Sequence, residues 1–201
     1  MSTFYKVIRA IAYPIIRLVF RIKPVGLEKM PKEGGLILCC NHTSFTDVAF
    51  LIIICRRQIY FMAKSELFKN RFVNWLFTKM GAFAVQRGSG GAEAIEHAVK
   101  LINEGKVMGI FPEGTRSRDG TPKAAKSGVA VIAAKTKAPI LPVAIYRKGK
   151  IAPFRKNTIR FGDIIKPEEL DIDINSRTDL KQAANLIMGR ITQLWEAGHG
   201  D

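Results

Sequence analysis

Residues 36–55 read LILCCNHTSFTDVAFLIIIC, and this stretch decides how the chain folds. The apolar run Leu36–Cys40 is short and ends at polar, turn-forming residues, so it predicts a buried strand. After the polar segment, Thr46–Cys55 is largely apolar over the length of a short helix. The stretch is therefore a strand, a turn and a helix in succession, which is the unit from which α/β domains are built.

The same alternation continues along the rest of the chain. Further apolar runs predict strands at Ile59–Ala63, Ala82–Gln86, Val107–Phe111, Leu141–Tyr146 and Thr158–Phe161. Helical spacing of apolar residues predicts helices at Leu67–Met80, Ala92–Asn103, Val129–Thr136 and Asp179–Glu196. Because strands and helices alternate, we expect a single α/β domain with a mixed, largely parallel sheet flanked by helices.

The composition is ordinary in apolar content and unusual in charge. The 201 residues are 47% hydrophobic, which excludes a disordered chain, and 32 Lys and Arg outnumber 17 Asp and Glu to give a net charge of +15. Such an excess indicates an anionic partner, namely nucleic acid, a membrane surface or an acidic substrate. No nucleic-acid-binding motif is present and the aromatic residues lie in apolar runs, so we expect no nucleic-acid partner. A basic, non-enzymatic binding module is the distant alternative.

The N-terminal residues 4–20 read FYKVIRAIAYPIIRLVF and have the pattern of an amphipathic helix. Arg9 and Arg17 interrupt the apolar run, which argues against a secretory signal and a membrane-spanning helix. On a helical wheel, one side carries the cations Lys6, Arg9, Arg17 and Arg21, and the opposite side carries Phe4, Ile8, Ile11, Ile15, Leu18 and Val19. This arrangement is typical of a helix that lies in the interface of a bilayer of anionic phospholipids.

We therefore expect residues 1–23 to form a basic, membrane-associating helix, bent or split at Pro14, ahead of a domain at residues 24–201. The alternative is a first helix packed on that domain with a solvated basic edge. The cysteines lie in apolar runs, which predicts reduced thiols, and with the basic helix this favours the cytoplasmic face of the cell membrane and a peripheral or monotopic protein.

His42 and Asp47 follow the first strand of this unit and are candidates for acid–base chemistry. A general base needs a neutral imidazole, and a carboxylate nearby orients the ring and stabilises its cation. The two residues are five apart, so they meet only if a turn lies between them. Ser44 and Asp47 also match the capping box that begins a helix, which is the structural alternative for Asp47.

A second junction, residues 107–118, reads VMGIFPEGTRSR and ends another strand in a turn. Arg116 offers a planar fork for phosphate oxygens, and Thr115 and Ser117 offer hydroxyl groups. We expect Glu113 to orient Arg116 or to accept a hydrogen bond from a hydroxyl group of the substrate. The alternative is an ordinary polar turn with an ion pair. Further cations at strand ends or helix starts extend this predicted phosphate pocket: Lys64, Arg87 and Lys126.

Taken together, these residues resemble the glycerolipid acyltransferase family, of the bacterial 1-acylglycerol-3-phosphate acyltransferase type. The first motif of that family is N-H-x-x-x-x-D, which is matched by residues 41–47. The second is an apolar strand ending in arginine, matched by Gly81 to Arg87, and the third, F-P-E-G-T-R-S, is matched at residues 111–117. The fourth is an apolar strand with proline, here residues 141–145.

The resemblance implies transfer of an acyl chain from a thioester to the free hydroxyl of 1-acylglycerol 3-phosphate (lysophosphatidic acid), which yields phosphatidic acid. His42 would act as the general base and Asp47 would orient it. The glycerol phosphate would be held by Arg87, Glu113, Gly114, Thr115 and Arg116. Supporting roles are expected for Asn41, Lys64, Ser117, Lys126 and Pro142.

The resemblance implies no metal and no bound cofactor, with acyl-CoA or acyl carrier protein as the co-substrate. Within the superfamily, the acceptor could instead be glycerol 3-phosphate, another lysophospholipid or a lyso-aminolipid.

Overall fold

The computed structural model describes residues 3–85 and 91–200, within which the strands form one seven-stranded sheet in the order β1–β7–β6–β2–β5–β3–β4. The strands are β1 Ile22–Val25, β2 Leu36–Cys40, β3 Ile59–Lys64, β4 Ala82–Val85, β5 Val107–Ile110, β6 Ile140–Arg147 and β7 Asn157–Phe161. All neighbouring strands are parallel except β6 and β7, which are antiparallel. The prediction of a mixed, largely parallel sheet is confirmed.

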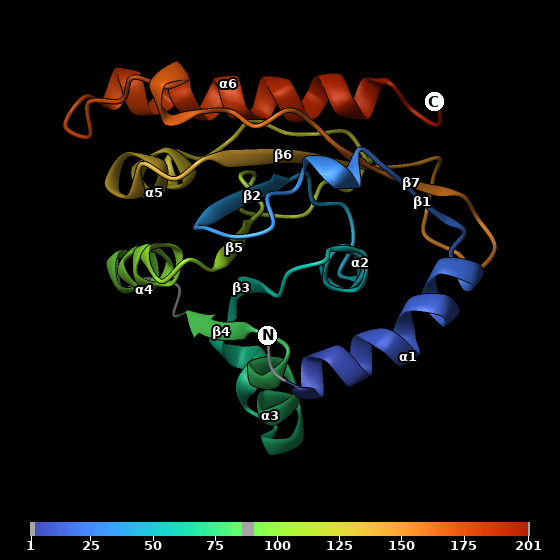
Figure 1. Cartoon of the computed structure of the whole chain (residues 1–201). Helices are drawn as coiled ribbons and strands as arrows, with labels where there is room; N and C mark the ends of the chain where they lie inside the picture. Colours follow the sequence, from blue (N-terminus) through green and yellow to red (C-terminus); the bar gives the residue numbers. More distant parts are fainter. Residues whose placement is uncertain (1–2, 86–90, 201) are drawn as a thin grey trace.

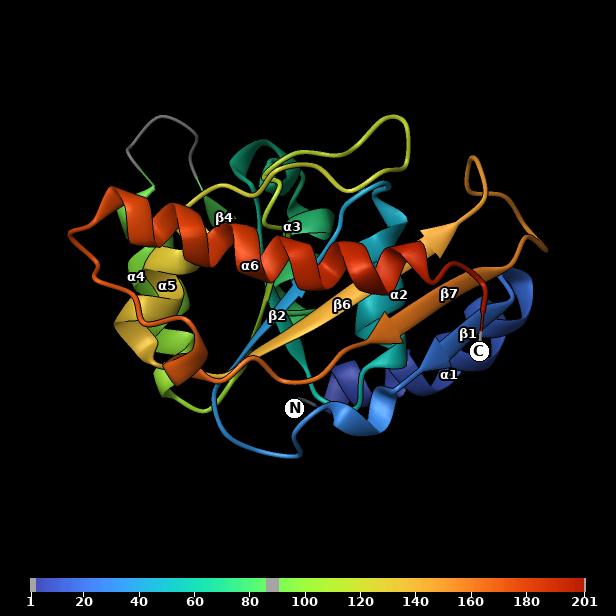
Figure 2. The ribbon, with the colours of Figure 1, turned by 90° about the horizontal axis from the view of Figure 1, so that it is seen from above.

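Helices cover both faces of the sheet (Figures 1 and 2). They are α1 Thr3–Val19, α2 Thr46–Ile54, α3 Arg71–Lys79, α4 Ala92–Asn103, α5 Gly128–Thr136 and α6 Arg177–Glu196, with short 3-10 turns at Leu27–Lys29, Ser65–Phe68 and Pro167–Glu169. Because side chains alternate along a strand, Leu36, Leu38 and Cys40 of β2 pack in one core with α1 and α2. Ile37 and Cys39 point to the other face and pack with α4, α5 and α6.

Two elements differ from the sequence prediction. The strand β1 was not predicted, because it is only four residues long and contains Pro24. It pairs with β7 at the edge of the sheet, where a residue without an N–H is tolerated. The single helix expected at Leu67–Met80 is instead a 3-10 turn and then α3, because the side chain of Asn70 accepts hydrogen bonds from the N–H groups of Phe72 and Val73 and begins a new helix. Gln86, the expected end of β4, lies outside the described residues.

The first helix packs against α2 through the side where Arg9 lies. The hydroxyl of Tyr5 donates to the carbonyl of Ile52 at 3.1 Å, and Nε of Arg9 donates to the carbonyl of Ile53 at 2.9 Å. Arg9 therefore neutralises the carbonyl end of α2, and the expectation that it faces lipid headgroups is wrong. Of the bend or split expected at Pro14, the split is absent, since α1 is one helix with Pro14 inside it.

The opposite side of α1 exposes a row of apolar side chains. Val7, Ile11, Ile15 and Leu18 are between 51% and 73% exposed, and their spacing places them on one stripe of the helix. Phe72 and Trp75 of α3 are also exposed, and Trp75 meets the ring of Phe4 at 5.1 Å between centroids. We call these six side chains, Val7, Ile11, Ile15, Leu18, Phe72 and Trp75, the apolar outer surface. In the described part of the chain, no helix is both long and apolar enough to cross a bilayer.

Candidate active site

The predicted site residues meet at the edge of the sheet where β2, β3, β5 and β6 end. Because these strands are parallel, the loops that follow them share this edge. His42 follows β2, the segment 113–117 follows β5, and Arg147 is the last residue of β6. Residues that are far apart in sequence therefore surround one imidazole.

His42 and Asp47 are in hydrogen-bond contact. Nδ1 of His42 lies 3.2 Å from Oδ2 of Asp47, and the imidazole is 17% exposed whereas Asp47 is fully buried. A carboxylate at Nδ1 accepts the proton of that nitrogen, which leaves Nε2 as the basic atom. The turn at Thr43 and Ser44 brings together two residues that one continuous helix would keep apart.

The carboxylate of Asp47 is surrounded by donors. Its Oδ2 accepts hydrogen bonds from the N–H groups of Thr43 and Ser44, both at 2.7 Å, and its Oδ1 pairs with the guanidinium of Arg147. Burial raises the pKa of Asp47, but the hydrogen bond to His42, the charge of Arg147 and the two N–H groups together hold that pKa below its usual value. Asp47 therefore remains ionised in a fully buried position.

Only one half of the predicted capping box forms at Asp47. Asp47 lies in the first turn of α2 and accepts from the N–H of Ser44, but the hydroxyl of Ser44 accepts from the N–H of Thr46 and not from that of Asp47. The same oxygen of Asp47, Oδ2, contacts His42. The hydrogen bond to Ser44 at the start of α2 thus helps to fix the carboxylate that orients the imidazole.

Glu113 is part of the framework that holds His42. It is 2% exposed, and its Oε1 accepts a hydrogen bond from the backbone N–H of His42 at 2.8 Å. Burial raises the pKa of Glu113. The N–H of Ser117 donates to the carbonyl of His42 at 2.7 Å, so the loop after β5 holds His42 at both its N–H and its carbonyl. Glu113 contacts His42 rather than orienting Arg116 as the sequence suggested.

Two stacked aromatic rings support one face of the imidazole. The ring of His42 lies on Phe111 at 4.0 Å between centroids, and Phe111 lies on Phe61 at 5.8 Å. Phe61 reaches this position because Gly109 has no side chain, since a Cβ on Gly109 would lie 2.2 Å from the ring. The orientation of His42 therefore depends on a glycine inside β5.

The residues predicted to hold phosphate lie on the exposed part of the loop after β5. Gly114, Thr115 and Arg116 are all exposed, and Gly114 adopts a left-handed conformation with a φ of 67°. The side chain of Lys126 passes over Gly114, with Cδ 2.9 Å from where a Cβ would be. Gly114 thus allows Lys126 and Arg116 to share one exposed turn. Lys64 is exposed at the end of β3, and Arg87 lies outside the described residues.

Two of the predicted supporting residues, Asn41 and Pro142, take part in the hydrogen bonding of the sheet. Asn41 is fully buried, and its side chain extends the pairing of β2 with β6 by exchanging two hydrogen bonds with the backbone of Ile145 at 2.8 and 3.0 Å. Pro142 lies inside β6, beside Cys39 of β2, and its carbonyl accepts from the N–H of Gly162. Pro142 is therefore a residue of the sheet, inside the apolar strand that the fourth motif predicts.

Sequence reasoning missed Arg147, which belongs to the same cluster. Its side chain is only 7% exposed, it pairs with Asp47, and it lies over the ring of Phe50 at 5.7 Å from the centroid. The signal that pointed to Lys64 and Arg87, a cation at the end of an apolar strand, also applies to Arg147. Its burial could not be deduced from that signal.

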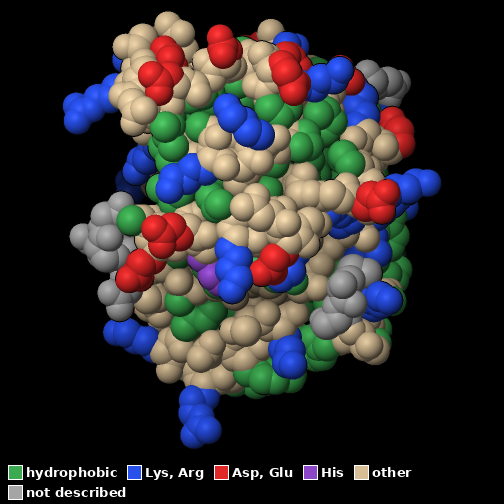
Figure 3. Space-filling model, turned by 60° about the vertical axis from the view of Figure 1, so that its left-hand side comes forward, with side chains coloured by type: hydrophobic (Ala, Val, Ile, Leu, Met, Phe, Trp, Pro, Cys, Tyr) green, Lys and Arg blue, Asp and Glu red, His purple; other side chains and the backbone are tan. Residues whose placement is uncertain are grey.

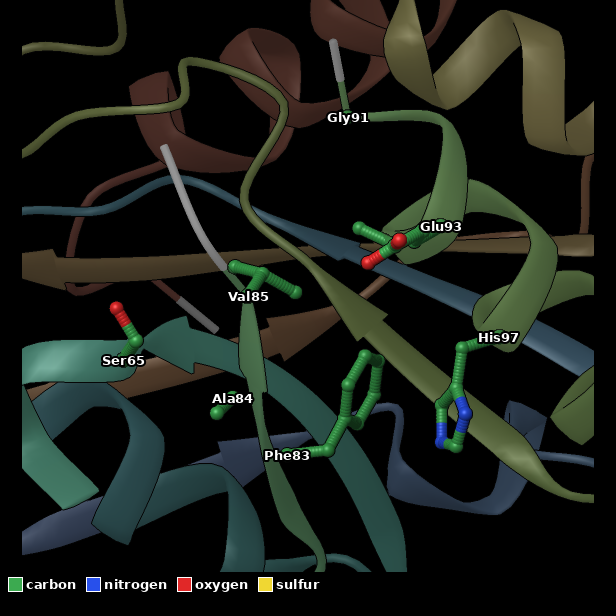
Figure 4. Close-up of a pocket in the computed structure, with 8 residues that line it drawn as sticks. Ser65, Phe83, Ala84, Val85, Gly91, Glu93 and His97 are labelled. Atoms are coloured by element: carbon green, nitrogen blue, oxygen red, sulfur yellow. The ribbon is translucent and has the colours of Figure 1, made fainter. Parts of the chain in front are cut away.

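A cavity of about 540 Å³ lies between β4 and α4, away from the pair of His42 and Asp47, which we call the dyad. Figure 4 shows Phe83 and His97 side by side in its wall, and their ring centroids are 4.3 Å apart. The lining residues include neither His42 nor Asp47. His97 is therefore an exposed residue of α4 that contacts Phe83 and is separate from the candidate active site.

Comparison with known proteins identifies the family. The model of the Acyltransferase family matches residues 21–146, a range that includes all four motifs described above. The 1-acyl-sn-glycerol-3-phosphate acyltransferase of Bacillus subtilis is 35% identical over 147 residues, covering 68% of this chain and 73% of that protein. The protein of the same name from Borreliella burgdorferi is 36% identical over 141 residues, covering 69% of this chain and 56% of that protein.

A solved structure agrees with these matches. The crystal structure of PlsC, the 1-acyl-sn-glycerophosphate (LPA) acyltransferase from Thermotoga maritima, superposes with a TM-score of 0.74 at 25% sequence identity. The superposition covers 98% of this chain and 80% of the Thermotoga chain. Since the family model spans more than half of the sequence and the fold agrees, the chain is a member of the acyltransferase family.

Proposed function

We propose that this enzyme transfers an acyl chain from an acyl thioester to the free sn-2 hydroxyl of 1-acylglycerol 3-phosphate and so forms phosphatidic acid. The observation that carries the proposal is the pairing of His42 with a buried, ionised Asp47 at an edge of the sheet that also exposes Arg116 and Lys126. The names of the relatives from Bacillus and Borreliella support the same acceptor.

In the proposed mechanism, Nε2 of His42 takes the proton of the acceptor hydroxyl as its oxygen attacks the thioester carbonyl. A carbon–oxygen ester bond forms, the carbon–sulfur bond breaks, and the proton passes to the departing thiolate. Asp47 stabilises the imidazolium that exists between these two proton transfers. The sequence of steps uses no metal, no bound cofactor and no covalent enzyme intermediate.

The phosphate of the acceptor is assigned to the exposed turn after β5. Arg116 and Lys126 supply positive charge there, and Thr115 supplies a hydroxyl group. Arginine suits phosphate because its planar fork donates two parallel hydrogen bonds. Lys64, which ends β3, is proposed as a further cation, and so is Arg87, because in the sequence it comes directly after an apolar run.

The enzyme is further proposed to be a peripheral or monotopic protein of the cytoplasmic face of the cell membrane. The apolar outer surface supports this, because exposed apolar side chains bordered by cations favour the interface of anionic bilayers. Lys6 and Arg17 are exposed along the edge of the apolar stripe on α1. Lysophosphatidic acid and its product both reside in such a bilayer.

The charges on one face of the molecule disfavour the alternative of a basic nucleic-acid-binding module. On the side of α4 and α5, Lys and Arg side chains are interspersed with Asp and Glu side chains (Figure 3). A nucleic-acid binder is expected to gather its cations into one stripe or patch.

The test is an acyl-transfer assay on the purified protein, read by mass spectrometry. Acyl-CoA and acyl carrier protein are offered as donors to a panel of lysophosphatidic acid, glycerol 3-phosphate, other lysophospholipids and a lyso-aminolipid. We expect phosphatidic acid from lysophosphatidic acid and loss of the activity in His42→Ala. The matched control is His97→Ala, which removes an exposed histidine of α4 and should leave turnover unchanged. Normal turnover in a folded His42→Ala variant would exclude the mechanism.

A further inference from the structure

A second cavity, of about 440 Å³, adjoins the dyad on the side of β6. Its wall includes Thr43 and Ser44, whose N–H groups bind Asp47, and Arg147, which pairs with the other oxygen of that carboxylate. Trp195 of α6 closes another part of the wall. We call this space the polar cavity. Its lining residue Thr43 directly follows His42 in the chain, and the cavity is not part of the proposed acceptor site.

The polar cavity has the charge of an anion site. Arg118 and Lys150 line it, both side chains are exposed, and within residues 3–85 and 91–200 neither makes a hydrogen bond or an ion pair. One acidic residue, Asp119, also lines it, but its Oδ1 is held by the hydroxyl of Ser117 at 2.5 Å and by the N–H of Thr121 at 3.2 Å. Arg118 and Lys150 are therefore available to a ligand, whereas Arg147, the third cation of the wall, is paired with Asp47.

The order of the strands places part of the wall of the polar cavity across β2 from the acceptor site. Lys64 ends β3 and the exposed turn with Arg116 follows β5, on one side of β2 and His42, whereas Arg147 ends β6 and Lys150 follows it, on the other side. Residues 117–121, which include Arg118, continue the loop after β5 and complete the wall of the cavity. Two substrates can thus approach one imidazole from opposite sides. The side occupied by the polar cavity is free for the second substrate of the reaction.

The two faces of the sheet also differ in the kind of molecule they suit. The apolar outer surface lies on α1 and α3, and α1 packs in the core of one face, whereas Trp195 packs in the core of the opposite face. Figure 1 shows α1 and α6, the helix of Trp195, on opposite sides of the sheet, so α6 is turned away from a bilayer on which α1 lies. A water-soluble, anionic group fits there better than a lipid.

We infer that the polar cavity binds the phosphorylated, water-soluble end of the acyl thioester donor. The chemistry required is a phosphate ester on a pantetheine arm, which both CoA and the phosphopantetheine group of a carrier protein provide. With that phosphate beside Arg118 and Lys150, the arm passes Thr43 and presents the thioester to Nε2 of His42. This inference rests on the proposed function, since it assigns the donor of that reaction.

The experiment compares donors with and without the phosphorylated end. kcat/KM is measured for acyl-CoA, for acyl carrier protein and for the matching S-acyl pantetheine, which has no phosphate, with wild type and with the double variant Arg118→Glu, Lys150→Glu. We expect kcat/KM for acyl-CoA to fall at least about tenfold, because charge-assisted phosphate contacts are replaced by repulsion. We expect kcat/KM for S-acyl pantetheine and KM for lysophosphatidic acid to stay unchanged.

The matched control is Lys135→Glu, Lys181→Glu, which makes the same change of charge at exposed lysines of α5 and α6. It should leave all three donors unaffected. A loss with acyl-CoA alone assigns CoA, and a loss with both phosphorylated donors assigns the phosphopantetheine group that they share. An equal loss with S-acyl pantetheine, a similar loss in the control, or no loss with either phosphorylated donor overturns the inference. Wild type that forms no phosphatidic acid from any donor would instead overturn the proposed function.

Discussion

Arg147 and Asp47 are 100 residues apart in sequence and form an ion pair in which the side chains are 7% and 0% exposed. Asp47 in turn contacts Nδ1 of His42. The guanidinium therefore compensates a buried carboxylate whose role is to orient the imidazole. Removal of one partner of a buried pair leaves an uncompensated charge. A substitution of Arg147 should therefore disturb Asp47 and, through it, the orientation of His42.

Replacement of Arg147 by Met should lower kcat about ten- to hundredfold, which corresponds to about 1.4–2.8 kcal/mol of transition-state stabilisation, and should leave KM for lysophosphatidic acid nearly unchanged. Steady-state kinetics measure kcat and KM separately. In a second variant, Arg147→Ala, the side chain is shorter, and addition of millimolar guanidinium should restore part of kcat. The control is Arg57→Ala, which removes an arginine bound to the carbonyls of Gly34 and Gly105 at the opposite edge of the sheet. That variant should lose stability and keep kcat; a loss of kcat as large as that of Arg147→Met would contradict a specific role.

The stability contributed by Asp47 should depend on pH. Its pKa in the folded protein is lower than the value of about 3.9 in an unfolded chain, so its ionised form stabilises the fold. This contribution is fully present above the unfolded pKa and disappears as the pH falls through the folded pKa. Urea unfolding at pH 7 and pH 3 should therefore show a smaller difference in free energy of unfolding between wild type and Asp47→Asn at pH 3. A difference that grows on acidification would refute the assignment of an ionised Asp47.

Arg116→Ala should weaken binding of the acceptor more than it slows chemistry. Because the side chain of Arg116 is exposed and does not hold His42 or Asp47 in place, we expect KM for lysophosphatidic acid to rise about tenfold, equivalent to about 1.4 kcal/mol, with little change in kcat. The comparison is Arg190→Ala, which removes an exposed arginine paired with Glu169. A large fall in kcat at saturating acceptor would place Arg116 in the chemical step instead.

Membrane binding should depend on the apolar stripe of α1. Ile11 and Leu18 are 60% and 73% exposed, so Ile11→Asp with Leu18→Asp should leave the fold intact and reduce co-sedimentation with anionic phospholipid vesicles about tenfold or more. Ile174→Asp is the control, because Ile174 is an exposed apolar residue outside the apolar outer surface. Unchanged sedimentation of the double variant would show that the stripe does not contact lipid.

Gly109→Ala should disturb His42 from a distance. The added methyl group would collide with the ring of Phe61, so we expect a loss of about 1–3 kcal/mol in stability from overpacking. The displaced ring would shift Phe111 and the imidazole stacked on it, which should also lower kcat. Gly189→Ala changes a glycine of α6 with open space around it and no left-handed backbone, and it controls for the added methyl group. Retained kcat in Gly109→Ala would show that the stack does not orient His42.

Much of the fold and of the site followed from local patterns in the sequence. The apolar run of β2 and the apolar residues of α2 specify a strand and a helix because burial is set by periodicity. The polar segment between them placed His42 and Asp47 at a strand end, and Gly114 and Arg116 marked the turn after β5. Such features depend on residues close together in the chain, so the sequence by itself determined them.

Other features depend on contacts that only the tertiary structure establishes. Arg9 and Arg17 both read as surface cations of one helix, yet Arg9 binds the carbonyls of α2 because the packing of α1 turns it inward. Arg147 became part of the site because β6 lies beside β2, so that the ends of two strands distant in sequence share one edge. Periodicity specifies which residues are buried but not which element buries them, and that choice decided how the chain holds a charged carboxylate inside the protein.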